Sequence, residues 1–144
     1  MMLTPMVRSA MTPAPQVIDA HSDTASALDL MKSLGVRHLP VTDRDRLVGI
    51  LSERDLRGAR ALLDHAPGVL GPPVGDLCSR RLLVVSPDDP LDEAAALMAD
   101  RKVGAVLVLE GTDLVGIMTS IDVCRSLGSL VARLRRLGTT RDEA

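Results

Sequence analysis

The hydrophobic positions in the first half of the chain follow a helical spacing and then form two short runs. One face of a predicted helix is made of apolar residues spaced three and four apart: Ala27, Leu30, Met31 and Leu34. Gly35 ends this helix, because glycine is common just beyond a helix C-terminus. Aliphatic and β-branched residues predict strands over 36–41 and 47–51, joined by a polar hairpin. With an extended stretch at 16–18 and a second helix near Ser52, the predicted order is β-α-β-β-α.

The same pattern returns 67 residues later without a gap. The run Leu47-Val48-Gly49-Ile50 aligns with Leu114-Val115-Gly116-Ile117, and the helix face aligns with Ala94, Leu97 and Met98. An extended stretch at 83–85 opens this second copy. Repetition of this kind indicates one structural unit used twice. Because neither copy alone buries enough surface to be stable, we expect an α/β fold of the α+β type, in which two β-α-β-β-α motifs pack with pseudo-twofold symmetry.

The repeat also predicts the boundaries of the chain's parts. We expect a single module over 1–144, with one motif over 6–62, a Gly- and Pro-rich linker over 66–75, and a second motif over 74–128. A C-terminal helix extension and tail is expected over 129–144. This helix carries a heptad-like apolar stripe: Val123, Leu127, Leu130, Leu134 and Leu137. Arginines without neighbouring acids accompany the stripe, and we interpret the segment as a docking or dimer helix; a membrane-surface or RNA-contacting helix is the alternative.

Composition narrows the classes of function. The 144 residues include no Phe, Tyr or Trp, which excludes aromatic base-stacking platforms, aromatic cages and tyrosine acid–base chemistry. A net charge of −2 argues against a general DNA-coating role. Cys78 and Cys124 form no CxxC pair, and no apolar run has membrane length, so we expect a cytoplasmic protein with two buried thiols. Without a catalytic motif or metal-ligand spacing, neither an enzyme nor a metal site is expected.

Each copy carries Ser or Thr followed three residues later by Asp, directly after its second strand. The two stretches are Ser52-Glu53-Arg54-Asp55 and Thr119-Ser120-Ile121-Asp122. A carboxylate at a helix start accepts hydrogen bonds from both ribose hydroxyls, and the neighbouring hydroxyl and helix amides hold a phosphate. The same pattern is also a plain helix cap, and the two roles are compatible. The pattern makes these turns candidate ligand contacts, and the family resemblance described next implies the full set of ribose and phosphate ligands: Ser52, Arg54, Asp55, Thr119 and Asp122.

The repeated strings resemble a known family. GVRHLPVTDRDRLVGILSERDL, at 35–56, resembles the motif of CBS (cystathionine-β-synthase-type) domains, and VGAVLVLEGTDLVGIMTSIDV, at 103–123, resembles it more loosely. Two such motifs in tandem resemble a stand-alone Bateman module. The resemblance implies a homodimeric, non-catalytic regulatory protein that binds an adenosyl ligand such as AMP, ADP or ATP and controls an unidentified protein. The alternative is a protein-interaction module with vestigial clefts, acting through its dimer surface or its basic C-terminal helix.

The resemblance also implies roles for further residues. Arg37 and His38 take the positions that contact phosphate in the family, and a titrating imidazole there makes ligand binding depend on pH. The second copy has Gly104 and Ala105 at the equivalent positions, which implies that the two ligand sites are unequal. Family geometry takes adenine from one motif and ribose from the other. The adenine pockets are then lined by Thr12, Gln16 and Val36 opposite Asp122, and by Ser79, Leu83 and Val103 opposite Asp55. The alternatives are an exposed strand without a ligand for Arg37 and His38, and plain core for the valines.

Overall fold

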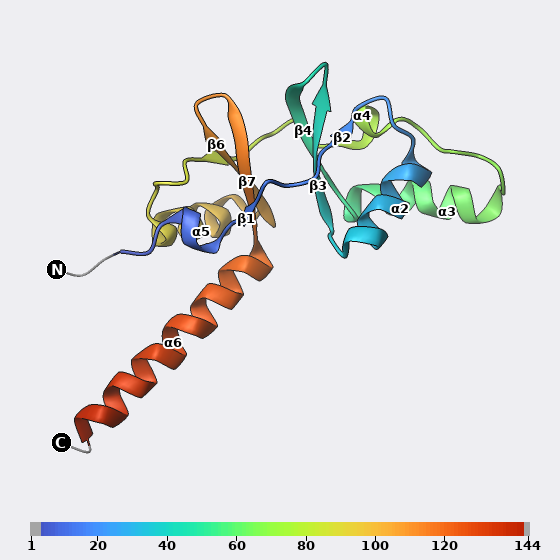
Figure 1. Ribbon diagram of the computed structural model, residues 1–144. Coiled ribbons are helices and arrows are strands. Elements are labelled where there is room, and N and C mark those ends of the chain that lie inside the picture. Colours follow the sequence, from blue (N-terminus) through green and yellow to red (C-terminus); the bar gives the residue numbers. More distant parts are fainter. Residues whose placement is uncertain (1–3, 143–144) are drawn as a thin grey trace. The chain divides into compact units, whose positions relative to one another are not determined.

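The computed structural model describes residues 4–142, and side chains up to residue 139. The described chain forms two compact units of mixed α and β structure (Figure 1). One unit is Pro15–Leu83, and the other joins the segment up to Ala14 to the chain from Val84 onward. The predicted α+β fold class is confirmed.

The Pro15–Leu83 unit is built around a small mixed sheet. Its elements are β2 (Ile18–Asp19), α2 (Thr24–Leu34), β3 (His38–Asp43), β4 (Arg46–Ser52), the 3₁₀ helix η1 (Arg54–Leu56), α3 (Arg57–His65) and α4 (Val74–Leu77). The sheet order is β2-β3-β4, with β2 parallel and β4 antiparallel to β3. Asp23 caps the start of α2 by accepting from the Ser26 amide, and Gly35 ends it with φ +67°. The predicted helix and its end are therefore confirmed.

The second unit repeats this plan with one more paired strand. Its elements are α1 (Val7–Ala10), β1 (Thr12–Pro13), β5 (Val84–Val85), α5 (Leu91–Arg101), β6 (Ala105–Glu110), β7 (Asp113–Thr119) and α6 (Ser120–Asp142). The sheet order is β1-β7-β6-β5, with β1 antiparallel to β7 and β5 parallel to β6. Four pairs of elements coincide at the 67-residue offset: α1 with α4, α2 with α5, β3 with β6, and β4 with β7. The repeat found in the sequence is thus a structural repeat.

The first segment of each copy pairs with the last strand of the other copy. Thr12 lies opposite Ile117 on β7, and Ser79 exchanges two 2.9 Å backbone hydrogen bonds with Ile50 on β4. The predicted motifs over 6–62 and 74–128 include these segments, but their first predicted extended stretches are 16–18 and 83–85, so the pairing of Thr12 and Ser79 was not predicted. The strand predicted from Val36 begins two residues later, at His38, because the Val36 amide still bonds to the Met31 carbonyl and closes the end of α2.

Each unit has its own apolar core. In the Pro15–Leu83 unit the core comprises Ile18, Ala20, Ala27, Met31, Leu39, Val41, Leu51, Leu56 and Val74. Two expectations about buried residues are wrong. Leu34, at the last turn of α2, is 45% exposed, so the apolar face of this helix is buried only as far as Met31. Cys124, on α6, is exposed, and Cys78 is half-buried. Neither cysteine forms a disulfide bond.

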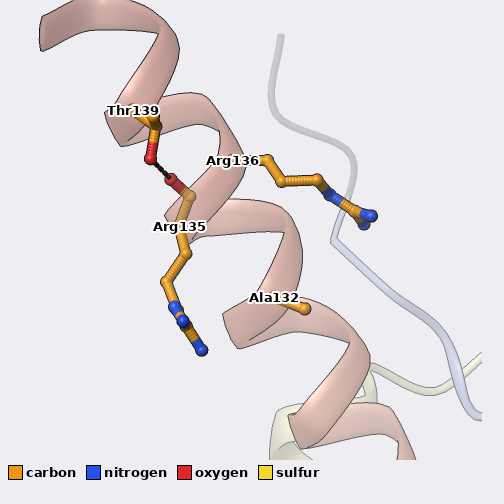
Figure 2. Close-up of a pocket in the computed structure, with 4 residues that line it drawn as sticks. All are labelled: Ala132, Arg135, Arg136 and Thr139. Carbon is orange, nitrogen blue, oxygen red and sulfur yellow. Dashed lines mark hydrogen bonds between the residues drawn. The ribbon is translucent and has the colours of Figure 1, made fainter.

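Helix α6 extends beyond the rest of its unit. Figure 1 shows it continuing from the end of β7 as a long projecting helix, and its side chains from Leu127 to Thr139 are exposed. A surface hollow of about 620 Å³ lies along it, and the described residues that line it are Ala132, Arg135, Arg136 and Thr139 (Figure 2). The Thr139 hydroxyl donates to the Arg135 carbonyl at 2.9 Å. All four of these residues lie on α6. The last two residues of the predicted 129–144 extension lie outside the described chain.

Candidate functional site

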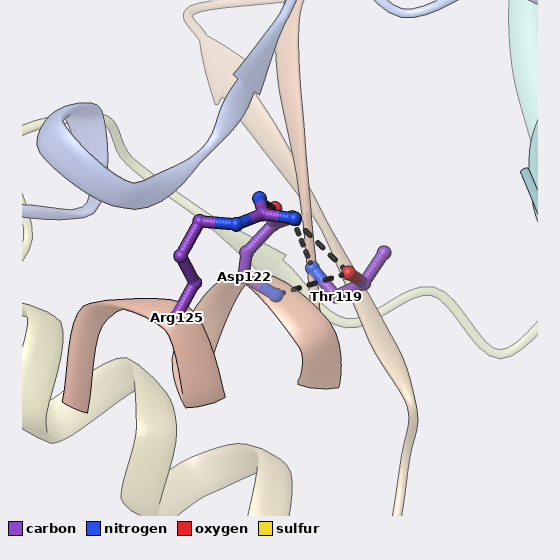
Figure 3. A network of polar contacts seen from close by, with 3 residues as sticks. All are labelled: Thr119, Asp122 and Arg125. Carbon is purple, nitrogen blue, oxygen red and sulfur yellow. Dashed lines mark hydrogen bonds and ion pairs between the residues drawn. The ribbon is translucent and has the colours of Figure 1, made fainter. Parts of the chain in front are cut away.

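The turn between β7 and α6 holds a buried carboxylate in a network of hydrogen bonds (Figure 3). Oδ2 of Asp122 accepts from the Thr119 amide at 2.9 Å and from the Thr119 hydroxyl at 3.1 Å. Oδ1 of Asp122 accepts from Nη1 of Arg125 at 3.4 Å. The Asp122 side chain is 7% exposed and that of Arg125 is 72% exposed. The turn therefore presents a buried, hydrogen-bonded carboxylate next to an exposed cation.

The equivalent turn after β4 has the same cap with a more open carboxylate. Oδ2 of Asp55 accepts from the Ser52 amide at 2.8 Å, and the Asp55 amide donates to the Ser52 hydroxyl at 3.1 Å. This reciprocal pair is a capping arrangement, as the sequence pattern predicted. Within the described chain, no group donates to Oδ1 of Asp55, and its side chain is exposed. Capping thus uses one carboxylate oxygen and leaves the other for a ligand.

The exchanged segments bring two predicted adenine-pocket residues to these turns. Thr12 is on β1, beside the strand that ends in Thr119 and leads to Asp122. Ser79 is paired with Ile50, on the strand that ends in Ser52 and leads to Asp55. Both Thr12 and Ser79 are exposed. Each of these two predicted adenine contacts thus lies on a segment next to the strand that leads to the Asp turn of its own unit.

Arg37 and His38 lie next to the Asp55 turn. The Arg37 carbonyl accepts from the Glu53 amide at 2.8 Å, and Nε of Arg37 is 3.8 Å from Oε2 of Glu53. His38 begins β3 opposite Ser52. Burial lowers the pKa of His38; the nearby charge of Asp55 opposes this shift, and the charge of Arg37 adds to it. An exposed cation and a neutral imidazole therefore flank the first turn, whereas Gly104 and Ala105 flank the second.

The remaining predicted residues are divided between the units. Gln16, Val36 and Leu83 belong to the Pro15–Leu83 unit, whereas Val103 and Asp122 belong to the other. Arg54 is exposed on η1. Val36 is exposed and Val103 is half-buried, so neither is a fully buried core residue. The two predicted cross-motif pockets therefore remain predictions.

Two features of the site were missed in the sequence. One is Arg125, whose equivalent in the first copy is Gly58. The other is the glycine of each LVGI run: a Cβ on Gly49 would lie 2.8 Å from the Ser79 carbonyl oxygen, and one on Gly116 would lie 3.2 Å from that of Thr12. These glycines let the exchanged segment approach the strand. Their recurrence at a fixed offset was visible in the sequence, but their packing partner was not.

Between residues 4 and 142, no three His, Cys, Asp or Glu side chains lie close enough to hold a metal ion. None of the helices in that same range is long and apolar enough to cross a membrane.

Comparison with known proteins places the chain in a family. The sequence model of the CBS domain matches residues 7–62 and 74–129. The CBS domain-containing protein YhcV of Bacillus subtilis is 30% identical over 118 residues, which cover 81% of each protein. The crystal structure of AcuB from Vibrio cholerae is similar with a TM-score of 0.81 at 28% identity, over 93% of this chain and 99% of that one.

A ligand complex is also among the similar structures. The crystal structure of CBSX2 in complex with AMP has a TM-score of 0.72 at 30% identity, over 87% of this chain and 97% of that one. Some other curated relatives are longer, and the chain spans 40% of one and 14% of another. The matched family model covers most of this sequence in two copies, as the internal repeat does. The chain therefore belongs to the CBS domain family and contains two CBS domains.

Proposed function

We propose that this protein is a regulatory module that binds an adenosyl ligand, such as AMP, ADP or ATP, at its two Ser/Thr-x-x-Asp turns. The observation that carries the proposal is the doubled turn itself, with Asp55 and Asp122 at equivalent places after β4 and β7. The AMP complex of CBSX2, which is 30% identical to this chain, supports the ligand class. No catalytic step is assigned to the module.

Each turn offers the same chemistry to a ribose phosphate. The Asp carboxylate accepts from the 2′- and 3′-hydroxyls through the acceptor positions that capping leaves free. Amides at the start of the following helix favour a phosphate. Arg37, which is exposed beside the Asp55 turn, adds a cation for the phosphate group. With no aromatic residue in the chain, the base contributes without ring stacking, so most of the affinity comes from ribose and phosphate contacts.

Thermal unfolding with a ligand panel tests this proposal. The panel comprises AMP, ADP, ATP, NAD and S-adenosylmethionine, and unfolding is followed by circular dichroism because the chain has no aromatic fluorophore. A ligand at 100 times its Kd is expected to add about 2.7 kcal/mol of stability. Asp55→Ala and Asp122→Ala are each expected to remove part of the shift. Absence of a shift with every ligand at millimolar concentration would overturn the proposal.

A second observation favours association of two copies through α6. Four leucines at heptad spacing are exposed on this helix: Leu127, Leu130, Leu134 and Leu137. A projecting apolar stripe of this kind is typical of a protein interface. We propose that a second copy of the chain covers it, and that the regulated partner recognises the resulting dimer.

The heptad positions explain why a second copy fits. In a parallel pair, Leu127 and Leu134 occupy a positions while Leu130 and Leu137 occupy d positions, and leucines there form a knobs-into-holes seam. Arg133 falls at a g position and faces the partner's Gly138 rather than another cation. The charge of the helix therefore does not oppose the pairing. The stripe spans only two heptads, so further contacts between the copies would have to add to it.

A further inference from the structure

Arg125 lies on the carboxylate that the proposed function assigns to the ribose. Its Nη1 donates to Oδ1 of Asp122 at 3.4 Å, while Oδ2 accepts from the amide and hydroxyl of Thr119 (Figure 3). Because Oδ2 already accepts two hydrogen bonds, a ribose diol that donates two more must place both on Oδ1. The guanidinium takes up one of the two acceptor positions of Oδ1, so it must leave before both ribose hydroxyls bind there.

The first copy lacks this cation. The residue equivalent to Arg125 is Gly58, and Oδ1 of Asp55 has no donor within the described chain. Asp55 is also exposed, whereas the Asp122 side chain is only 7% exposed. A ribose reaches Asp55 without displacing a charged group, so the two turns differ in what binding requires.

The displaced guanidinium creates a preference among ligands. A carboxylate as buried as that of Asp122 loses a favourable charge interaction when Arg125 moves away. Ribose hydroxyls replace the hydrogen bond but carry no charge. A phosphate on the same ligand gives the exposed, flexible guanidinium a new anion to bind, often with two parallel hydrogen bonds. An unphosphorylated nucleoside offers no such replacement.

We propose that Arg125 is a specificity-determining residue that makes the Asp122 site selective for a phosphorylated adenosyl ligand over the unphosphorylated nucleoside. The Asp55 site, with glycine at the equivalent position, discriminates less. This inference rests on the proposed function, because it requires Asp122 to bind the ribose.

Calorimetric titration of the full chain with AMP and with adenosine tests the role of Arg125. Asp55→Ala leaves the Asp122 site as the binding site, and Asp122→Ala leaves the Asp55 site. In the Asp55→Ala protein, we expect AMP to bind about 10- to 100-fold more tightly than adenosine, the range of a charge-assisted hydrogen bond. Adding Arg125→Ala should weaken AMP binding, leave adenosine binding equal or tighter, and reduce this ratio about tenfold or more.

Placing an arginine at Gly58, the position equivalent to Arg125, tests whether the cation alone makes a site prefer AMP over adenosine. A Cβ at Gly58 meets no atom within 4 Å, and the residue is inside α3, so a side chain fits there. In the Asp122→Ala protein, Gly58→Arg is expected to raise the preference of the Asp55 site for AMP over adenosine. Gly58→Ala is the matched control and should leave that preference unchanged.

The outcomes separate the inference from the proposed function. If Arg125→Ala weakens AMP and adenosine by the same factor, or changes neither, then Arg125 has no role in selectivity and the inference is wrong. AMP binding by the unmodified chain would still support the proposed function in that case. If the unmodified chain binds neither adenosine nor any ligand of the panel, both are overturned.

Discussion

Gly49 packs against Ser79 so closely that a Cβ at residue 49 would lie 2.8 Å from the Ser79 carbonyl oxygen. Ile50, the residue after Gly49 on β4, exchanges two backbone hydrogen bonds with Ser79 and holds the two segments together. In the other unit, a Cβ on Gly116 would likewise lie 3.2 Å from the Thr12 carbonyl oxygen. The glycine in each LVGI run is thus the residue that admits the segment carrying a predicted adenine contact.

The close approach predicts that Gly49→Ala destabilises the protein. The added methyl would also lie 2.6 Å from Cys78 Sγ, so backbone or side chain must shift. Overpacking of this kind costs about 1–3 kcal/mol, which thermal unfolding followed by circular dichroism measures. Gly58→Ala is the control, since its Cβ meets nothing within 4 Å and alanine favours a helix. Equal stability of Gly49→Ala and Gly58→Ala would contradict the packing argument.

Asp23 is predicted to stabilise the start of α2. Its carboxylate accepts from the Ser26 amide at 2.8 Å, and this hydrogen bond lowers the pKa of Asp23. Asp23→Ala should cost about 1 kcal/mol in the free energy of unfolding at neutral pH. Because the folded-state pKa lies below the unfolded value, the contribution is present above the unfolded pKa and is lost as pH falls through the folded one. A difference between the two proteins that does not shrink in acid would be evidence against this cap.

His38 is predicted to make AMP binding depend on pH. Burial lowers its pKa below the ordinary value of 6.5, so the imidazole is neutral in the free protein at neutral pH. As pH falls from the unfolded pKa through the lowered folded one, the unfolded chain binds the proton first and stability decreases. A bound phosphate favours the charged imidazole, so binding takes up a proton and tightens as pH falls.

Calorimetry of the unmodified chain and His38→Gln at several pH values measures this effect. Subtracting the two profiles removes the titration of the AMP phosphate itself, which both share. The unmodified chain should gain affinity relative to His38→Gln as the pH is lowered from about 7.5 to 6. Parallel profiles would mean that His38 does not contact the phosphate.

The apolar stripe of α6 predicts a dimer that a single charge disrupts. Leu134 is 57% exposed in the single chain and takes a central a position in the proposed pair. Leu134→Glu should therefore shift the full chain toward the monomer in light scattering without lowering the thermal stability of the units. Thr139→Glu, which lies off the stripe on the same helix, is the control. A monomeric unmodified chain, or an unchanged mass for Leu134→Glu, would contradict pairing through α6.

The sequence predicted the parts of this fold that depend on local patterns. The apolar spacing that includes Ala27 and Met31, the end of α2 at Gly35 and the cap between Ser52 and Asp55 are all present, since each is determined within a few residues. The 67-residue repeat extended those elements to the second copy.

The parts that could not be predicted depend on distant contacts. The pairing of Thr12 with β7 and of Ser79 with β4 joins segments remote in sequence, and two-residue strands carry almost no periodic signal. Arg125 stood out neither as a motif residue nor as part of the repeat, because its role arises only from the position of its guanidinium on Asp122.

The most direct test of whether the two Asp turns bind the adenosyl ligand is calorimetric titration with AMP. It compares the unmodified chain with the Asp55→Ala/Asp122→Ala double variant. The purified chain is first freed of any copurified nucleotide, whose absorbance near 260 nm stands out because the protein has no aromatic residues. The account predicts saturable binding to the unmodified chain and its loss in a double variant that remains folded by circular dichroism. Undiminished AMP binding by that folded variant, or no binding by the unmodified chain, would contradict the assignment of these turns as the adenosyl-ligand site.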